Sequence, residues 1–238
     1  KYSALVPCIH YNIAEEEARF GNANLKPTTS YNFDLGGEYY FESVGLVSLE
    51  FFYKNVKDVI AEEKWKSTND PNIPAGLLNE DGEPVKYEIT KPINAYDADL
   101  FGLEFAYQRD FGFIAPSLKC LGFYGTYTYT HSSTKKHQFE HRTLEEGEDI
   151  KMTGSPEHTA NASLYFENKG LNVRLSYNFA SDFVDEFGTV AALDRYYDKV
   201  NYLDLNASYT FGNKFKTTFY AEANNLLNQP LRYYQGTK

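Results

Sequence analysis

One polar stretch contains the residues best suited to metal chemistry. "HSSTKKHQFEHRTLEEGED" spans residues 131–149 and includes His131, His137 and His141. Imidazole nitrogens bind zinc and iron, so one interpretation is a site for a metal ion or a ferric complex. Spacings of six and four residues in a loop fix no ligand geometry, so the other interpretation is a solvated, charged loop. We favour the second interpretation and predict no metal ligand.

Other reactive side chains form no recognisable arrangement. The run "EEGED" at 145–149 is a candidate calcium loop, but it lacks the Asp-x-Asp-x-Asp-Gly pattern, and a solvated acidic turn fits better. Cys8 and Cys120 lack metal or redox spacing. Scattered Ser, His and Asp residues give no basis for a catalytic triad. We therefore predict no catalytic residue, no cofactor and no enzymatic activity.

Aromatic and arginine side chains in the polar connections are better candidates for ligand contact. Such side chains supply much of the binding energy at protein surfaces. Packing of the loops on themselves explains them equally well. The candidate substrate-binding residues are Trp65, Arg195, Tyr196, Tyr197, Arg232, Tyr233 and Tyr234.

Strands must position these residues, because apolar and polar side chains alternate along much of the chain. In "NKGLNVRLSYNF" (168–179), Leu171, Val173 and Leu175 fall on one face, and Asn172 and Arg174 on the other. This period of two predicts a strand with one apolar face. Alternation predicts eight strands, at 30–41, 45–60, 97–108, 118–130, 158–167, 168–179, 200–211 and 216–226.

The connections between these strands alternate in length. Those at 42–45, 109–117, 168–170 and 212–215 are short, whereas those near 61–96, 131–156 and 181–198 are long and polar. The strands mostly have ten or more residues, near the ~9–11 that a tilted strand needs to cross a bilayer. Soluble strands are usually about five or six residues long. The pattern favours an all-β fold, an antiparallel transmembrane β-barrel, over a soluble all-β domain.

The composition is consistent with a barrel whose apolar face contacts lipid and whose polar face lines a water-filled lumen. The sequence has 21 Tyr and 18 Phe, many of them near strand ends, as in interfacial aromatic girdles. A net charge of −10 argues against nucleic acid as a partner. We predict that Phe51, Leu103, Phe123, Leu164, Leu175 and Leu205 face lipid. The predicted lumen-lining residues are Asp34, Glu38, Glu50, Glu104, Arg174, Asp204 and Glu222, and plain solvation explains these as well.

Several motifs in the right order carry a family resemblance. "RFGNANLKPTTSYNFDLGGEYYF" (19–41) contains Gly21, Asn22, Leu25, Lys26, Pro27 and Ser30, followed by Asp34 and Glu38. "LEFFYKNVKDVI", "GLEFAYQRDF", "YLDLNASYTF" and "YAEANNLLNQPLRYYQG" follow downstream. Together they resemble strands of TonB-dependent outer-membrane receptors, and the details are most similar to versions from Bacteroidetes-type bacteria.

The resemblance implies a partial domain over residues 1–238. The family barrel has twenty-two strands, and these would be strands fourteen to twenty-one, without the plug domain and the last strand. Residues 1–28 would be mostly an outside loop. The implied function is uptake of a scarce nutrient (siderophore, haem, glycan, peptide or vitamin) across the outer membrane of a Gram-negative cell. Implied partners are outer-membrane lipid, the nutrient, the TonB complex acting through the plug, and a surface lipoprotein.

Two other functions remain compatible with the residues themselves. A soluble carbohydrate-binding domain or glycosidase would also alternate along its strands, and would stay soluble without detergent. An ungated porin-like or adhesin barrel would share the membrane fold but would have no plug domain encoded upstream.

Overall fold

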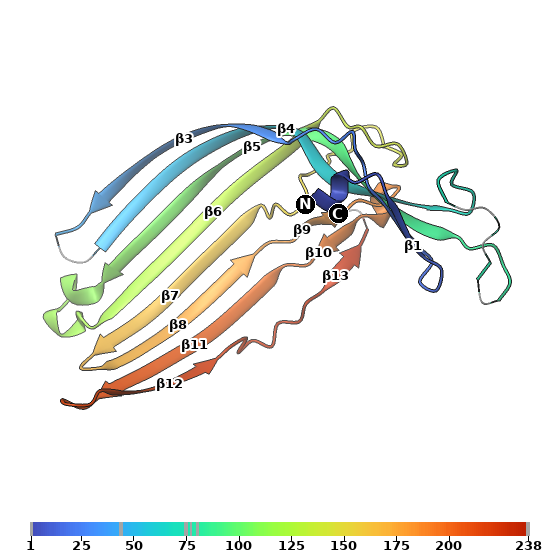
Figure 1. Cartoon of the computed structure of the whole chain (residues 1–238). Helices are drawn as coiled ribbons and strands as arrows, with labels where there is room; N and C mark the ends of the chain where they lie inside the picture. Colours follow the sequence, from blue (N-terminus) through green and yellow to red (C-terminus); the bar gives the residue numbers. More distant parts are fainter. Residues whose placement is uncertain (1, 43–44, 74–75, 77, 80, 237–238) are drawn as a thin grey trace.

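Eight long antiparallel strands form the wall of the computed structural model (Figure 1). The structure describes residues 2–42, 45–73, 76, 78–79 and 81–236. The long strands are β3 (Thr29–Tyr40), β4 (Gly45–Ser67), β5 (Tyr87–Asp110), β6 (Leu121–Lys135), β7 (His158–Asn168), β8 (Leu171–Ala180), β11 (Val200–Phe211) and β12 (Thr217–Ala223). All eight predicted strands are therefore present, in the predicted order.

Shorter elements occupy the connections. They are the strands β1 (Ile9–Asn12), β2 (Glu17–Phe20), β9 (Phe183–Glu186), β10 (Arg195–Tyr197) and β13 (Tyr233–Gln235), and the 3₁₀ turns η1 (Tyr2–Leu5), η2 (Phe111–Phe113), η3 (Pro116–Leu118) and η4 (Ala191–Leu193). In the described part of the chain, no helix is long and apolar enough to cross a membrane.

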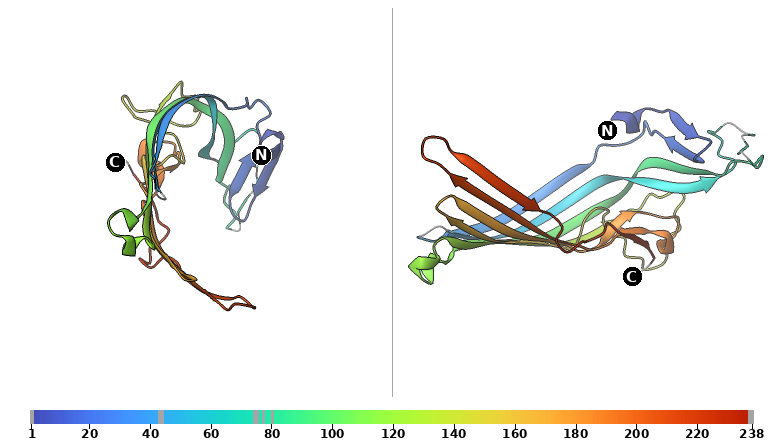
Figure 2. Two further views of the ribbon diagram at one scale, coloured as in Figure 1. Left: turned by 90° about the vertical axis from the view of Figure 1, so that its left-hand side faces the viewer. Right: turned by 90° about the horizontal axis from the view of Figure 1, so that it is seen from below.

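The sheet is an open, curved wall and not a closed barrel. Seen from its end, the sheet traces an arc whose two sides do not meet (Figure 2). Among the described strands, β3 pairs only with β4, and β12 only with β11. The short turns lie at one end of the wall, and the long connections lie at the other (Figure 1). The fold is thus a partial, unclosed β-barrel.

The strand register confirms the predicted division into two faces. Phe51 pairs with Leu103, and Leu164, Leu175 and Leu205 pair in a row across β7, β8 and β11. Directly paired residues point to the same side of a sheet, so these apolar side chains share one face. Glu50 pairs with Glu104 on the opposite face.

The apolar face is not packed against other protein. Tyr31 is 75% exposed, and Phe219, at the other end of the sheet, is 64% exposed. A soluble sandwich would bury this face in its core. Near the short turns, Phe41 contacts Tyr39 and Tyr107, and Tyr107 contacts Phe123, which gives a row of rings like an interfacial girdle.

The prediction of a long connection at 61–96 is wrong in part. β4 continues to Ser67 and β5 begins at Tyr87, so much of this segment is a projecting hairpin. Bulges between Val56 and Ile60 interrupt the register. Asp58 takes a positive φ of 53° there, and its N–H donates to Asp97 Oδ1 at 3.0 Å. The bulges interrupt the alternation of apolar and polar residues, and charged residues on both faces of the hairpin obscure this alternation further.

The segment 1–28, predicted to be mostly an outside loop, contains a short hairpin. Residues of this segment form β1 and β2, and β2 runs parallel to β5 with Glu17 beside Glu88. The predicted start of the fourth strand at 118 falls within η3, and β6 begins at Leu121. The motif that leads into β3 is held by Asn94, whose side chain accepts from Lys26 N at 2.8 Å and donates to Lys26 O at 3.0 Å.

Candidate functional site

The long connections 136–157 and 181–199 pack together at the end of the wall away from the short turns. Ile150, Val184 and Phe187 form an apolar core with residues of β4 and β5, including Ala98, which is fully buried. Ala98 alternates with Phe101 along β5 and lies on the opposite face, the one predicted to line the lumen. The connections therefore fold over the lumen side of the wall.

A buried arginine joins the two connections. The side chain of Arg142 is 1% exposed. Its Nη1 donates to the Gly188 carbonyl at 2.9 Å, and its Nη2 donates to Asp194 Oδ2 at 2.9 Å. Arg142 also donates to Asp194 Oδ1 and to Glu148. Burial lowers the pKa of Arg142, but the hydrogen bonds and charges of Asp194 and Glu148 outweigh burial and raise this pKa overall.

A small sheet rich in aromatic residues lies beside Arg142 and its partners. Strand β10 pairs with β9 on one side and with β13 on the other. The Tyr196 and Tyr234 rings stack with centroids 5.2 Å apart. The Tyr234 hydroxyl donates to Asp182, and burial together with this hydrogen bond raises the pKa of Tyr234. Arg195 donates to Asp185 at 2.9 and 2.6 Å.

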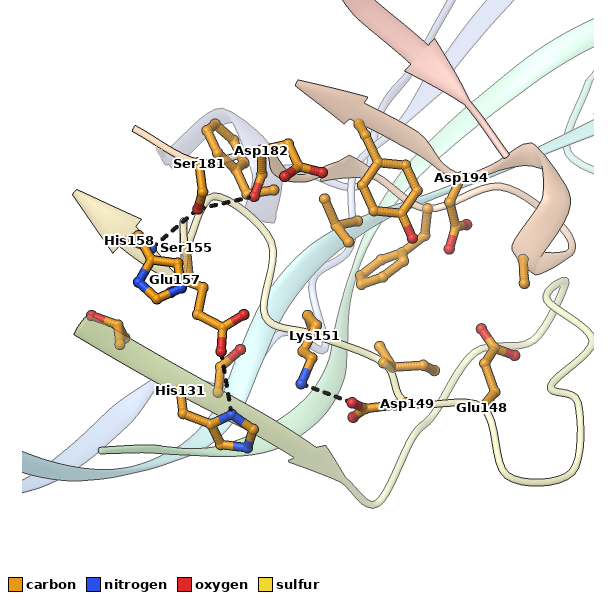
Figure 3. A pocket seen from close by; sticks show the side chains of 18 residues that line it. His131, Glu148, Asp149, Lys151, Ser155, Glu157, His158, Ser181, Asp182 and Asp194 are labelled. Carbon is orange, nitrogen blue, oxygen red and sulfur yellow. Dashed lines mark hydrogen bonds and ion pairs between the residues drawn. The ribbon is translucent and has the colours of Figure 1, made fainter. Parts of the chain in front are cut away.

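These elements enclose a cavity of about 600 Å³ (Figure 3). Its lining is rich in ionisable side chains. The acidic residues are Glu148, Asp149, Glu157, Asp182 and Asp194, and the basic residues are His131, Lys151 and His158. Lys151 Nζ lies 2.7 Å from Asp149, and His131 Nδ1 lies 4.0 Å from Glu157. The volume falls within the range of small-molecule sites. The arrangement can bind a polar ligand of that size.

The seven predicted substrate-binding residues separate into three groups. Trp65 lies on β4, not in a loop, and is 8% exposed beneath His141 and Phe20. Arg195, Tyr196, Tyr197, Tyr233 and Tyr234 lie on strands β10 and β13, again not in loops. Tyr196 lines the 600 Å³ cavity, whereas Trp65 and Arg195 line a second cavity of about 720 Å³. Arg232 lies in the connection before β13, with Nη2 3.0 Å from Asp198.

The three histidines of the polar stretch 131–149 have different neighbours. His131 lies near Glu157, and His137 Nε2 lies 2.8 Å from the Thr134 hydroxyl. The His141 ring stacks on Trp65. In "EEGED", Glu148 is bound to Arg142 and Asp149 to Lys151. Sequence reasoning missed Arg142 and its partners, because one arginine in an acidic stretch gives no sign of burial.

The seven predicted lumen residues share the polar face of the wall. Glu50 pairs with Glu104, and Arg174 pairs with Asn206, which pairs in turn with Glu222. Alternation along β3 and β11 places Asp34, Glu38 and Asp204 on the same face.

Comparison with known proteins identifies the fold. The family model described as "TonB dependent receptor-like, beta-barrel" matches residues 11–226. The chain belongs to the TonB-dependent receptor family. The family resemblance drawn from the sequence is thereby confirmed, as is the prediction of a membrane β-barrel fold. Receptors of this family are transporters and not enzymes.

One relative of this TonB-dependent receptor chain is named as an outer-membrane protein, and two solved receptor structures share its fold. The iron-regulated outer membrane virulence protein of Vibrio cholerae is 26% identical over 215 residues, which cover 90% of this chain and 29% of that protein. A mutant of the ferric enterobactin receptor from Pseudomonas aeruginosa matches with a TM-score of 0.56 and 17% identity, over 94% of this chain and 30% of the receptor. The siderophore receptor PirA from Acinetobacter baumannii matches with a TM-score of 0.51 and 20% identity, over 89% of this chain and 29% of PirA.

These structural likenesses show a shared barrel wall. The chain spans less than a third of the length of each of these three relatives. The family match does not favour a soluble glycosidase or carbohydrate-binding domain, nor an ungated porin.

Proposed function

We propose that this chain is part of an outer-membrane receptor that binds a scarce nutrient outside the cell and passes it to the periplasm with energy from TonB. The observation that carries the proposal is the gathering of the long connections around the 600 Å³ cavity at the end of the wall away from the short turns. A receptor needs its binding surface on the outside, and the longer loops of outer-membrane barrels lie there.

The proposal includes a larger barrel than these eight strands. An unpaired strand edge is not tolerated in lipid, so β3 and β12 pair with further strands of a twenty-two-stranded barrel in the outer membrane. The plug that contacts TonB lies in the same protein, outside residues 1–238. The exposed apolar face contacts outer-membrane lipid. A surface lipoprotein that assists ligand capture remains part of this proposal.

The relatives favour a metal complex as the nutrient. One relative is named for iron regulation and another for ferric enterobactin, and a further structural match is a copper transporter. We propose a metal-containing nutrient ahead of a glycan, a peptide or a vitamin. The mixed acidic and basic cavity lining suits a polar complex of small size.

The test is uptake by cells that produce the full-length receptor. Cells limited for iron should accumulate a labelled ferric siderophore when they carry the receptor, and should not when either the receptor or TonB is deleted. Arg142→Ala should reduce binding of the labelled complex at the cell surface, because Arg142 holds the connections that form the cavity. Lys214→Ala is the control, because Lys214 is an exposed cation in the short turn 212–215, at the opposite end of the wall. Uptake that continues without TonB would contradict the proposal.

A further inference from the structure

Three side chains with metal-binding chemistry meet where connection 136–157 crosses β4. Glu63 lies on β4, and Glu140 and His141 lie in the connection. Each offers one ligand atom, and the three ligand atoms all lie within 4.8 Å of one another. Carboxylate oxygen and imidazole nitrogen are common ligands of zinc and related metals. Among the residues that the structure describes, no other group of three His, Cys, Asp or Glu side chains brings its ligand atoms this close together.

Glu63 has an incomplete hydrogen-bond shell. Its residue surface is only 3% exposed. Oε1 accepts a hydrogen bond from the His141 backbone N–H at 2.6 Å, whereas Oε2 is buried and has no hydrogen-bond partner among the described residues. A buried, unsatisfied carboxylate oxygen is costly, and each such atom in a native protein calls for an explanation. A cation between Glu63, Glu140 and His141 supplies the missing partner.

The surroundings fix one ligand and leave the site open to solvent. The His141 ring stacks on the Trp65 indole with centroids 4.0 Å apart and planes 16° apart, which restricts rotation of the imidazole. Glu140 and His141 are exposed, so an ion can enter from outside. One group opposes binding: Lys91 Nζ lies 3.6 Å from Glu140 Oε2 and must release this carboxylate.

We propose that Glu63, Glu140 and His141 bind a divalent transition-metal ion, with Zn²⁺ as the representative probe. Zn²⁺ accepts both carboxylate oxygen and imidazole nitrogen, and three protein ligands with one water complete a four-coordinate site. Ca²⁺ prefers six to eight oxygen ligands and Mg²⁺ an octahedral oxygen shell, so neither fits this ligand set well. The bound ion joins connection 136–157 to the β4–β5 hairpin.

This inference goes beyond nutrient uptake and does not depend on it. None of the three ligands lines the 600 Å³ cavity proposed for the nutrient, whereas His141 lines a different cavity of about 720 Å³. The site would bind free Zn²⁺ whether or not the receptor transports a ferric complex. A negative uptake experiment therefore leaves this proposal standing, and a negative zinc titration leaves nutrient uptake standing.

The test is calorimetric titration of the metal-depleted full-length receptor, purified in detergent, with Zn²⁺. Glu63→Gln, Glu140→Gln and His141→Gln should each weaken binding at one site by at least tenfold. His131→Gln is the matched control, because His131 also lies near a glutamate, Glu157, and should change the affinity less than twofold. Equal stoichiometry and affinity in the parent and all three variants would overturn the proposal.

A second variant separates metal binding from a merely structural role. Lys91→Ala removes the cation that competes for Glu140 and should tighten Zn²⁺ binding at least threefold. Co²⁺ should give a visible absorption band that the His141→Gln variant loses, because His141 supplies the nitrogen ligand. A Lys91→Ala protein that binds Zn²⁺ no more tightly than the parent, or a Co²⁺ band unchanged in His141→Gln, would also count against the site.

Discussion

Arg142 donates two hydrogen bonds to the carboxylate of Asp194, although 52 residues separate them in the sequence. The two side chains are 1% and 6% exposed, so the pair lies out of water. Arg142 Nε is buried without a hydrogen-bond partner among the described residues, and a buried ion pair is stable only when further hydrogen bonds satisfy most of its remaining polar atoms. Gly188 supplies two of these, since its carbonyl accepts from Arg142 and its N–H donates to Asp194. The pair therefore fixes two connections relative to each other.

Arg142→Ala should loosen connections 136–157 and 181–199 while leaving the barrel wall folded. Removal of one partner from a buried ion pair costs about 3–5 kcal/mol, because the remaining charge stays buried. Here both Asp194 and Glu148 lose their partner. Hydrogen exchange of the folded full-length receptor should show faster exchange in both connections and unchanged exchange in β7 and β8.

Arg232→Ala is the control for this prediction. Arg232 also lies in an ion pair, 3.0 Å from Asp198, but its side chain is 57% exposed. Exposed pairs contribute about 0–1 kcal/mol, so exchange should change little. Equal changes in hydrogen exchange for Arg142→Ala and Arg232→Ala would show that the buried Arg142–Asp194 pair does not hold the two connections together.

The division into two faces is testable with spin labels in the full-length receptor. Labels at Phe51, Leu103 and Leu175 should be relaxed by a lipid-soluble reagent. Labels at their neighbours Glu50 and Arg174 should respond to a water-soluble reagent instead, because adjacent strand residues point to opposite faces. Reversed accessibility at all positions would mean that the polar face meets lipid, since a shift by one residue exchanges the faces.

The wall could be predicted from sequence because its signal is local. Alternation needs only neighbouring residues, and the segment predicted at 200–211 is β11 as observed. Beyond the bulges near Asp58, the predicted strand ends at residue 60, although pairing continues to Ser67. Tight turns also carry a local signal, since Lys169 and Gly170 both take the positive φ of a two-residue hairpin turn.

The candidate site could be predicted only in part, because its contacts join distant segments. Their aromatic type makes Tyr196 and Tyr234 candidates, but nothing in the sequence predicts that their rings stack on one another. Trp65 was placed in a loop because the end of β4 lacks clear alternation. Glu63 lies 78 residues from His141, so no spacing rule could join them.

Gly170→Ala should destabilise the receptor through the turn between β7 and β8. Gly170 has a φ of +87°, and an added Cβ would lie 2.3 Å from the Thr210 carbonyl oxygen. A residue strained in this region costs about 1–3 kcal/mol. Gly37→Ala is the matched control, because a Cβ there meets no atom within 4 Å. Denaturant unfolding should show a lower free energy for Gly170→Ala and no loss for Gly37→Ala.

Asp97 should make the bulge of the β4–β5 hairpin sensitive to acid. The Asp58 N–H donates to Asp97, and Lys136 and Lys57 lie 2.9 and 3.5 Å away. The Asp58 hydrogen bond and then Lys136 lower the pKa of Asp97 from 3.8 to about 2. A carboxylate with a lowered pKa stabilises the folded state above its ordinary pKa, and this contribution is lost as the pH falls from about 4 to about 2.

Asp97→Asn measures this contribution. Both lysines are partly exposed and screened, so the effect is at most about 2 kcal/mol. Exchange of the Asp58 amide should be faster in the variant than in the parent at pH 6, and the two should converge near pH 2. A difference that persists unchanged at pH 2 would mean that the charge of Asp97 is not what holds the bulge.

Residues 1–238 expressed alone should not form a stable monomeric barrel in detergent. β3 and β12 each present one edge without a partner among the described strands. In an apolar medium each unpaired backbone group costs several kcal/mol, and an edge exposes about half of a strand's groups. The sum exceeds the ~5–15 kcal/mol by which folded proteins are stable. The isolated chain should therefore aggregate, and should lack the heat-sensitive gel mobility of a folded barrel.

Eight-stranded barrels exist, so direct closure of this sheet through pairing of β3 with β12 is the alternative. Cysteines at Leu35 on β3 and Phe219 on β12 report on it. Efficient cross-linking between them would show that β3 pairs with β12, and that the larger barrel proposed here is wrong.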